Sequence, residues 1–232
     1  MIKTKNLFFK YDKEFVLKNV SLKIGDGAFS AIIGSNGSGK TTLAKHFNAL
    51  LMPSKGDVFV DGLNTKNNEF EARKNVGFVF QNFDDQLVYS VVEEDIAFGL
   101  ENLGLNGVDV KRFTKKVLDK LGISNLAKKN VNTLSYGQKQ LVALAGVLAM
   151  EPKYIVFDEP TTMLDAKNKK DIMNVIRDLN KKEPITIILI TNVLDDLKYA
   201  DMVIVLKDGR VLFNDKKSKL NNKMLKKAGL YD

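Results

Sequence analysis

FSAIIGSNGSGKTTLAKHFNAL, residues 29–50, contains the segment that decides the fold. Residues 34–41, GSNGSGKT, match G-x-x-x-x-G-K-[ST] at every position, the pattern of a phosphate-binding loop (P-loop). The apolar run at 29–33 predicts a buried strand before the loop, and Leu43, Phe47 and Leu50 predict a helix after it. Strand, loop and helix in this order are the setting that the motif requires. The alternative, a Gly/Ser-rich turn before an ordinary helix, does not account for the full pattern.

The residue types of this loop suit a bound polyphosphate. Glycines let the backbone approach the phosphates closely and point N–H groups at their charge. Lys40 is expected to reach the β- and γ-phosphates, Thr41 to offer a hydroxyl to Mg²⁺, and Thr42 to bond another phosphate oxygen. The nucleotide-binding residues predicted here are Gly34, Ser35, Asn36, Gly37, Ser38, Gly39, Lys40, Thr41 and Thr42.

The composition describes a folded chain with a core of its own. Its 232 residues are 44% hydrophobic and include no cysteine, which predicts one domain, or one domain with a subdomain, without disulfides or thiolate metal sites. No apolar run reaches the ~20 residues of a membrane span, and no signal sequence is recognisable, so we expect a cytosolic location. The net charge of +8 comes from lysines scattered among 28 acidic residues. That pattern is typical of a solvated basic surface rather than a nucleic-acid site.

Three further strands are expected around the loop strand, at residues 4–9, 16–24 and 56–62. Tyr11 lies between the first two. An aromatic ring in this place can stack on an adenine, a contact of ~1–3 kcal/mol in base–aromatic systems. A plain core or surface tyrosine is the alternative.

Two more expected strands end in polar groups. Residues 76–80 lead to Gln81, whose amide oxygen can contact a metal ion or an attacking water. YIVFD at 154–158 ends in Asp158 and is followed by Glu159. An aspartate at this place holds Mg²⁺ in P-loop folds, and the neighbouring glutamate can orient or deprotonate water. Turn or helix-capping roles are the alternatives for the two carboxylates.

The middle of the chain is expected to be helical, without an interrupting strand. The predicted helices span 93–103, 109–121 and 136–150. They form a helical subdomain inserted into an α/β core, with no internal repeat.

LSYGQ at 134–138 opens the third of these helices. Ser135, the Gly137 amide and the helix dipole form a second candidate anion site. The alternative is a plain N-cap, in which Ser135 and Gln138 make a capping box.

The rest of the chain is expected to complete the sheet and end in a basic segment. The predicted elements are a helix at 166–179, a last buried parallel strand at 185–191, a terminal hairpin at 202–206 and 210–213, and a basic helix at 216–232. Asp165 is the predicted N-cap of the first of these, and Asn192 follows the parallel strand. The only histidine, His46, is expected to face solvent or a groove rather than to bind a metal.

The order of these motifs resembles the ATP-binding cassette (ABC) ATPases over nearly the whole chain. The motifs that carry the resemblance are the P-loop, Gln81, LSYGQ at 134–138, YIVFDEP at 154–160, MLD at 163–165 and ITN at 190–192. Within that family, VFQNFDDQL at 79–87, VVEEDIAFG at 91–99 and ENLG at 101–104 are similar to the ATP-binding subunit of energy-coupling factor (ECF) transporters, which import vitamins or transition-metal ions.

The resemblance implies roles in nucleotide binding. It implies that Tyr11 belongs to the adenine-stacking A-loop and that Val16 is a further nucleotide-binding residue. Residues 34–42 are then the Walker A motif, and Gln81 belongs to the Q-loop, with a contact to the metal.

The resemblance also implies roles in catalysis. Thr41 and Asp158 hold Mg²⁺, Glu159 is the catalytic base and Asp165 belongs to the D-loop. The signature of the opposite site consists of Ser135, Tyr136, Gly137 and Gln138. Of these, Ser135, Gly137 and Gln138 bind the γ-phosphate of ATP held on the opposite subunit.

Two positions depart from the family pattern. Asn192 replaces the switch histidine, and an asparagine can donate a hydrogen bond but cannot carry a proton or a charge. Asn192 nevertheless stays in the expected catalytic set with Glu159 and Gln81. Tyr136 replaces the commoner glycine of the signature and leaves Ser135 and Gly137 intact.

The expected fold is α/β: a P-loop NTPase (RecA-like) core with an N-terminal antiparallel β subdomain and an inserted α-helical signature subdomain. The whole chain, 1–232, is then one nucleotide-binding domain. Its expected parts are the core with the β subdomain at about 1–81 and 152–214, the helical subdomain at about 82–151 and a basic tail at 215–232.

The expected function is that of an ATPase subunit that binds ATP and Mg²⁺ and energises an ECF-type importer from the inner face of the cell membrane. Its expected partners are a second ABC ATPase in a head-to-tail dimer, with a heterodimer favoured, a transmembrane coupling subunit and a substrate-binding membrane subunit. Residues 82–99, with Phe83, Leu87, Val88 and Tyr89, are expected to form the groove for the membrane partner, with core packing as the rival for some of them.

Two alternatives stay open at this stage. A soluble ABC ATPase of DNA repair or the ribosome would use the net charge of +8, but the chain lacks a coiled-coil heptad pattern between Lys40 and Ser135 and carries a single cassette. A nucleotide-gated subunit with a degenerate site is compatible with Asn192.

Overall fold

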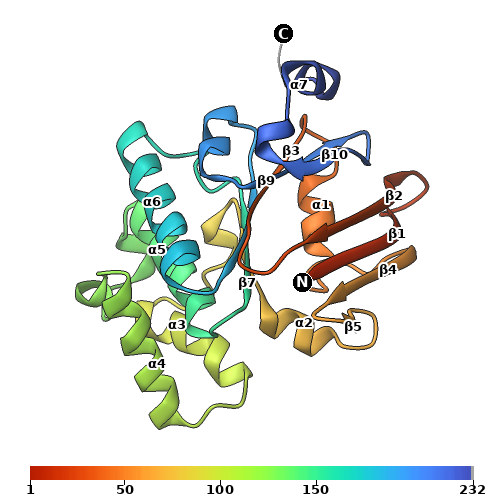
Figure 1. Ribbon diagram of the computed structural model, residues 1–232. Coiled ribbons are helices and arrows are strands. Elements are labelled where there is room, and N and C mark those ends of the chain that lie inside the picture. Colours follow the sequence, from red (N-terminus) through yellow and green to blue (C-terminus); the bar gives the residue numbers. More distant parts are fainter. Residues whose placement is uncertain (231–232) are drawn as a thin grey trace.

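The computed structural model describes residues 1–230, which form two sheets and the helices packed around them (Figure 1). The strands are β1 (Ile2–Lys10), β2 (Phe15–Ile24), β3 (Phe29–Ile33), β4 (Lys55–Val60), β5 (Leu63–Asn64), β6 (Val76–Val79), β7 (Tyr154–Asp158), β8 (Thr186–Ile190), β9 (Met202–Lys207) and β10 (Arg210–Lys216). The α-helices are α1 (Lys40–Lys45), α2 (Glu69–Asn75), α3 (Val92–Asn102), α4 (Gly107–Lys120), α5 (Tyr136–Ala149), α6 (Ala166–Lys182) and α7 (Asn222–Ala228). The 3₁₀ turns are η1 (Phe83–Asp85), η2 (Ser124–Leu126), η3 (Val131–Thr133), η4 (Leu194–Tyr199) and η5 (Lys217–Lys219).

The larger sheet has six strands in the order β10-β9-β3-β8-β7-β6. All its pairs are parallel except the β9–β10 hairpin. Strands of a parallel sheet are covered on both faces and therefore read as continuous apolar runs. The runs at β3, β7 and β8 are buried at every position for this reason.

Alternate residues of these strands enter two separate hydrophobic cores, because successive side chains point to opposite faces of a sheet. In β7, Ile155 and Phe157 join the core shared with α5 and α6, whereas Tyr154 and Val156 join the core shared with α1 and the smaller sheet. The large sheet is thus the middle layer of the molecule (Figure 1).

The smaller sheet has the order β2-β1-β4-β5 and is antiparallel throughout. It packs against α1 through residues such as Leu17, Val20 and Leu43, which share one core. The predicted α/β class, with an antiparallel sheet at the N-terminal end, is confirmed.

The helical group, α3 to α5, lies on one flank of the large sheet (Figure 1). Helix α5 approaches β6 very closely, since a Cβ added at Gly77 would lie 2.3 Å from Val147 Cγ1. Only glycine fits there, so this glycine allows the long apolar helix to rest directly on the sheet.

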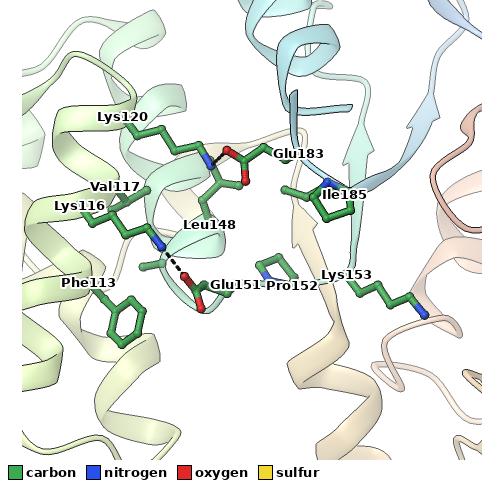
Figure 2. A pocket seen from close by; sticks show the side chains of 12 residues that line it. Phe113, Lys116, Val117, Lys120, Leu148, Glu151, Pro152, Lys153, Glu183 and Ile185 are labelled. Carbon is green, nitrogen blue, oxygen red and sulfur yellow. Dashed lines mark hydrogen bonds and ion pairs between the residues drawn. The ribbon is translucent and has the colours of Figure 1, made fainter. Parts of the chain in front are cut away.

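One ion pair crosses the seam between the helical group and the core, and a second lies beside it at the end of the helical group (Figure 2). Lys116 of α4 contacts Glu151 at 2.6 Å, and Lys120 contacts Glu183, the C-cap of α6, at 2.7 Å. Below them lies a cavity of ≈ 310 Å³ with apolar walls that include Phe113, Val117, Leu148 and Ile185. Partly exposed pairs of this kind stabilise by less than ~1 kcal/mol each, so the helical group is held to the sheet mainly by the hydrophobic core that they share.

The helix after the P-loop is shorter than predicted. It ends at Lys45 instead of continuing to Leu50. The amides of His46 and Phe47 bond to carbonyl oxygens three residues back, and Ala49 then adopts φ 56°, outside the helical region. The prediction for His46 is also wrong: its side chain is fully buried and its Nδ1 lies 2.7 Å from the Thr42 carbonyl oxygen. Burial lowers the pKa of His46 to about 4, so the ring is neutral near pH 7 and serves the packing.

The C-terminal segment is not one basic helix. Strand β10 continues to Lys216, and α7 spans only Asn222–Ala228, opened by the Asn221 side chain and closed by Gly229 at φ 72°. Residues 231–232 of the predicted helix lie outside the described residues.

Two further predictions about elements need correction. Strand β9 pairs in parallel with β3, so β8 is not the last parallel strand, and β9 belongs to the central sheet besides forming the hairpin with β10. Helix α2 and strand β5 were not predicted.

Within residues 1–230, no helix combines the length and the hydropathy that a membrane crossing requires.

Candidate functional site

Polar groups from four neighbouring parallel strands meet at the carboxyl edge of the large sheet. The P-loop follows β3, Asn192 follows β8, Glu159 follows β7 and Gln81 follows β6, and these strands are adjacent in the sheet. Because all four strands run the same way, their C-terminal ends lie together, which is where open α/β sheets bind ligands.

A cleft of ≈ 550 Å³ opens at this edge. Its lining residues are Val16, Asn36, Gly37, Gly39, Lys40, Thr41, Thr42, Gln81 and Glu159. The structure thus brings six of the nine predicted Walker A residues together with Gln81 and Glu159, whereas Gly34, Ser35 and Ser38 do not line the cleft.

The first glycine of the P-loop is required by close packing. A Cβ at Gly34 would lie 2.3 Å from the carbonyl oxygen of Leu206 and 2.6 Å from Ser38 Oγ. Gly39, at φ 99°, is the N-cap of α1 and turns the chain into the helix. Ser38 Oγ is buried and has no hydrogen-bond partner within residues 1–230, so a hydroxyl inside the loop is left unused.

Lys40 is held inside the loop. Its Nζ donates to the carbonyl oxygens of Gly34 at 2.9 Å and Ser35 at 3.2 Å, and the side chain is buried. Burial lowers the pKa of Lys40, while the charges of Glu159 and Asp158 oppose this shift. The ammonium group is therefore kept close to the cleft with weak, replaceable carbonyl partners.

Thr41 and Asp158 form a pair suited to a hard cation. Thr41 Oγ1 donates to Asp158 Oδ1 at 3.0 Å, and Asp158 is buried. Burial raises the pKa of Asp158, the Thr41 hydrogen bond opposes the shift, and the neighbouring Glu159 charge adds to it. A cation at this point would oppose the two influences that raise the pKa of Asp158, burial and the charge of Glu159.

The donor set fits Mg²⁺ bound to a nucleotide. Mg²⁺ in such sites takes one or two carboxylates and completes its shell with phosphate oxygens and water. Residues 1–230 contain no cluster of three or more His, Cys, Asp or Glu that could hold a metal without such help. One hydroxyl and one carboxylate beside a phosphate loop therefore match a metal that arrives with its ligand.

Glu159 is the most connected side chain of the site. Its Oε1 accepts from Asn192 Nδ2 at 2.8 Å, and its Oε2 accepts from Thr162 Oγ1 at 3.2 Å and from Gln81 Nε2 at 3.4 Å. Its backbone adopts φ 47°, a left-handed conformation that non-glycine residues seldom take outside functional sites. This turn aims the carboxylate at the cleft instead of continuing the strand.

Asn192 bridges the P-loop and Glu159. Its Nδ2 also donates to Asn36 Oδ1 at 2.7 Å, and its Oδ1 is buried with no partner within the described residues. Asn192 thus keeps the hydrogen-bond donor function expected of the switch residue, and its Oδ1 is an acceptor without a donor in the described part of the chain.

Asp196 stabilises the segments that follow β7 and β8, and the sequence did not predict this role. It is buried, and its Oδ2 accepts from Thr191 Oγ1 at 3.0 Å and from Thr161 Oγ1 at 3.2 Å. Lys169 Nζ lies 3.3 Å from its Oδ1. No motif marks an aspartate in a short 3₁₀ turn, so only the folded structure reveals that it joins the segments after β7 and β8.

Tyr11 and Val16 lie at the mouth of the cleft. Tyr11 is 64% exposed, its ring packs edge-on against Phe9, and its hydroxyl lies 3.4 Å from Thr42 Oγ1. An exposed ring beside the loop is available for stacking on a base. Val16 lines the cleft. Its carbonyl oxygen lies so close to Gly209 of the β9–β10 turn that a Cβ added to this glycine would be 2.0 Å away.

The signature residues do not line this cleft. Ser135 is the N-cap of α5 and forms the capping box with Gln138, as the alternative reading of LSYGQ predicted. Gly137 has no neighbour closer to its added Cβ than Asn168 Oδ1 at 3.8 Å, so its approach is open. Asp165 caps α6 by accepting from the backbone of Lys167 and Asn168, and these bonds lower its pKa.

The sequence profile of the ABC transporter family matches residues 17–162, which include the P-loop, Gln81, the signature and the Asp158-Glu159 pair. The chain belongs to this family. It is an ABC ATPase, and the resemblance stated from the motifs is confirmed. Membership of this family implies that the chain binds ATP.

Relatives with known names indicate which branch of the ABC family this chain resembles. The ABC ATPase is 42% identical to the energy-coupling factor transporter ATP-binding protein EcfA1 of Clostridium novyi over 239 residues, which covers 99% of this chain and 85% of the relative. It is 46% identical to EcfA1 of Clostridium perfringens over 217 residues, which covers 90% of this chain and 77% of the relative.

Solved structures agree with this placement. CbiO1 of Clostridium perfringens, part of the ABC transporter complex CbiONQ, superposes with a TM-score of 0.86 at 36% identity and covers 99% of this chain and 94% of its own. The ATP-binding cassette MJ0796, as a dimer bound to ADP and Pi, superposes with a TM-score of 0.81 at 31% identity and covers 93% of this chain and 98% of its own.

Proposed function

We propose that this ABC ATPase is the subunit that energises an ECF-type importer of vitamins or transition-metal ions. The single observation that carries the proposal is one cleft lined by Lys40 and Glu159 in a chain so similar to EcfA1 proteins. Asp158 is bonded to Thr41 of this cleft, and Asn192 is bonded to Glu159. Its location would then be the inner face of the membrane, bound to its membrane partners.

We propose a task for each side chain of the cleft. Lys40 leaves its carbonyl partners to bind the β- and γ-phosphates, and Thr41 with Asp158 would hold Mg²⁺, which neutralises phosphate charge when bound. Glu159 accepts the proton of the attacking water. Gln81 and Asn192 hold that carboxylate from two sides.

We propose a head-to-tail dimer with a second ABC ATPase, in which each site combines one P-loop with the signature of the other subunit. Two observations support it: Ser135 and Gly137 lie outside their own cleft, and the similar MJ0796 cassette is described as a dimer. Closure on ATP and opening after hydrolysis would move the membrane partners. A heterodimer is favoured because Asn192 makes this chain's own site the weaker one.

The proposed units are the core with the antiparallel sheet at about 1–81 and 152–214, and the helical subdomain at about 82–151. The tail at 215–232 adds the end of β10 and α7. The membrane partners proposed are a transmembrane coupling subunit and a substrate-binding subunit.

The groove proposed for the coupling subunit needs one correction. Phe83 is fully buried and belongs to the core, and Leu87 is half-buried. Val88 and Tyr89 are 64% and 42% exposed and remain candidates for contact. A shallow hollow of ≈ 240 Å³ beside Val88 extends over apolar residues of β6 and α5.

Val88→Lys and Tyr89→Lys are expected to abolish co-purification with the membrane subunits. A lysine buried in that contact would remain unpaired, a cost above the ~1.4 kcal/mol that corresponds to tenfold weaker association. The melting temperature is expected to stay constant because both side chains are exposed. The measurement is affinity purification from solubilised membranes, with mass spectrometry of the bound subunits.

Val108→Lys is the matched control, since Val108 is 78% exposed on α4 away from the hollow. Its co-purification is expected to equal that of the unsubstituted chain. Undiminished recovery of membrane subunits with the Val88 and Tyr89 variants would refute the groove. Absence of any membrane partner with the unsubstituted chain would refute the transporter function itself.

Asn192→His is expected to raise the ATPase rate of the isolated chain or of its complex. Removing one preorganised group that faces transition-state charge costs ~10²–10³ in rate, and Asn192 keeps a donor to Glu159, so the gain should be smaller than that. Steady-state phosphate release measures it. If a partner-free preparation already hydrolyses ATP and the substitution leaves the rate unchanged or lower, asparagine is competent and the unequal-site argument fails.

A further inference from the structure

The first turns of α5 contact the segment that carries Gln81. The hydroxyl of Tyr136 donates to the carbonyl oxygen of Gln81 at 3.3 Å, and its ring packs on Phe83 with ring centres 5.1 Å apart. Lys139, three residues further along the helix, pairs with Asp84 at 2.5 Å. Residues three or four apart share one face of a helix, so a single face of α5 binds this segment.

The same face also holds the other end of the segment. Gln86 Nε2 donates to the carbonyl oxygen of Ala143 at 3.1 Å, while Gln86 Oε1 accepts from the Phe80 amide at 3.1 Å. Residues 81–86 are therefore tied to α5 at both ends, and they are expected to move with this helix.

Gln140 links the same helix to the turn that carries Glu159. Gln140 is almost fully buried. Its Nε2 donates at 2.7 Å to the carbonyl oxygen of Pro160, which directly follows Glu159. Helix α5 thus contacts the backbone beside both Gln81 and Glu159, whose side chains lie 3.4 Å apart in the cleft.

We propose that Tyr136 is a positioning residue that fixes Gln81 in the ATP site of its own chain. The inference rests on the head-to-tail arrangement proposed above, in which α5 presents Ser135 and Gly137 to the nucleotide of the opposite site. A shift of α5 on engaging that nucleotide pulls on the Gln81 carbonyl and changes the contact between Gln81 and Glu159. Tyr136 thereby couples occupancy of one site to the catalytic geometry of the other.

The surroundings of the side chain support a role in its own chain. The ring is packed on Phe83 and the hydroxyl is bonded to Gln81, so both parts of Tyr136 point back toward their own Q-loop. Burial raises the pKa of Tyr136, with a smaller contribution from Asp84, so the hydroxyl keeps its proton as a donor at neutral pH.

Tyr136→Phe is the variant that tests this inference. It keeps the ring contact and removes only the hydrogen bond to Gln81, whose loss corresponds to roughly a 3- to 10-fold effect. Gln81 and Glu159 act on the reacting water, so kcat is expected to fall while the KM for ATP stays constant. A general structural defect would instead lower the melting temperature or change both constants.

The experiment measures the two sites of the ATPase pair separately. Replacing the P-loop lysine of the partner ATPase isolates the site built on this chain's P-loop, and Lys40→Ala isolates the site built on the partner's P-loop. Tyr136→Phe is expected to lower kcat at this chain's own site at least threefold more than at the partner's site. Tyr199→Phe is the control, because the Tyr199 hydroxyl makes no hydrogen bond within residues 1–230.

Each outcome decides the matter. A larger loss at this chain's own site supports the inference, whereas an equal loss, a larger loss at the partner's site or no loss at all overturns it. The unsubstituted pair is measured first: if it lacks ATPase activity at both sites, the proposed function has failed, and the inference, which depends on it, is withdrawn.

Discussion

Lys40→Ala is expected to weaken ATP binding by roughly 10- to 150-fold, which corresponds to the ~1.5–3 kcal/mol of a hydrogen bond to a charged group. Lys40 is the only lysine among the residues that line the cleft, and its Nζ sits at the carbonyls of Gly34 and Ser35 within the loop. Alanine removes the cation that meets the phosphates and leaves the loop backbone in place. Isothermal titration calorimetry with MgATP measures the difference.

Lys55→Ala is the matched control for charge, since Lys55 is an exposed lysine at the start of β4, outside the cleft. Its affinity for ATP is expected to equal that of the unsubstituted chain. Melting temperatures of both variants without nucleotide check that the loop still folds. Equal ATP affinity for Lys40→Ala and the unsubstituted chain would show that the nucleotide binds elsewhere.

Local patterns predicted the strands that carry the site. Strands β3 and β7 are short apolar runs with a phosphate loop or a carboxylate at the end, and such runs need no knowledge of distant partners. The prediction of Asp158 beside Thr41 needed only the rule that carboxyl ends of parallel strands meet, and the two side chains lie 3.0 Å apart. Their catalytic roles stay predictions.

Elements that depend on distant contacts were not predictable. Helix α2 buries only Ala72 and has no apolar stripe, so its sequence carries no helical period. His46 looked like a polar residue on a surface helix, but α1 ends beside it and Phe9, 37 positions earlier (46 − 9), packs against its ring. Tertiary packing decided both cases.

The links within the site were the hardest to foresee. Gln140 and Asp196 stand in no recognised motif, yet they join α5 and η4 to the segments that carry Glu159 and Asn192. Tyr136 was assigned only to the opposite site, because the signature was read as a unit and its contact with Gln81 spans 55 positions of sequence. A motif describes residue types at fixed spacing and does not contain such contacts.

Glu159→Gln is expected to slow hydrolysis by ~10²–10⁴, the usual contribution of a general base, while ATP stays bound. The amide keeps the shape of the side chain, and its oxygen can still accept from Asn192 Nδ2. It loses the basic oxygen that faces Gln81 and Thr162. Removing a negative charge beside the phosphates also lowers repulsion in the closed state, so the variant should accumulate as an ATP-bound dimer.

Single-turnover hydrolysis and size-exclusion chromatography with light scattering measure these two effects, and Glu101→Gln, an exposed glutamate on α3, is the control. An unchanged rate of single-turnover hydrolysis would remove Glu159 from the role of base. Monomers alone at saturating ATP, with and without a candidate partner ATPase, would contradict the head-to-tail dimer even if the rate falls. The two readouts differ because single-turnover hydrolysis reports the chemical step, which needs the Glu159 carboxylate, whereas light scattering reports the association of the two chains.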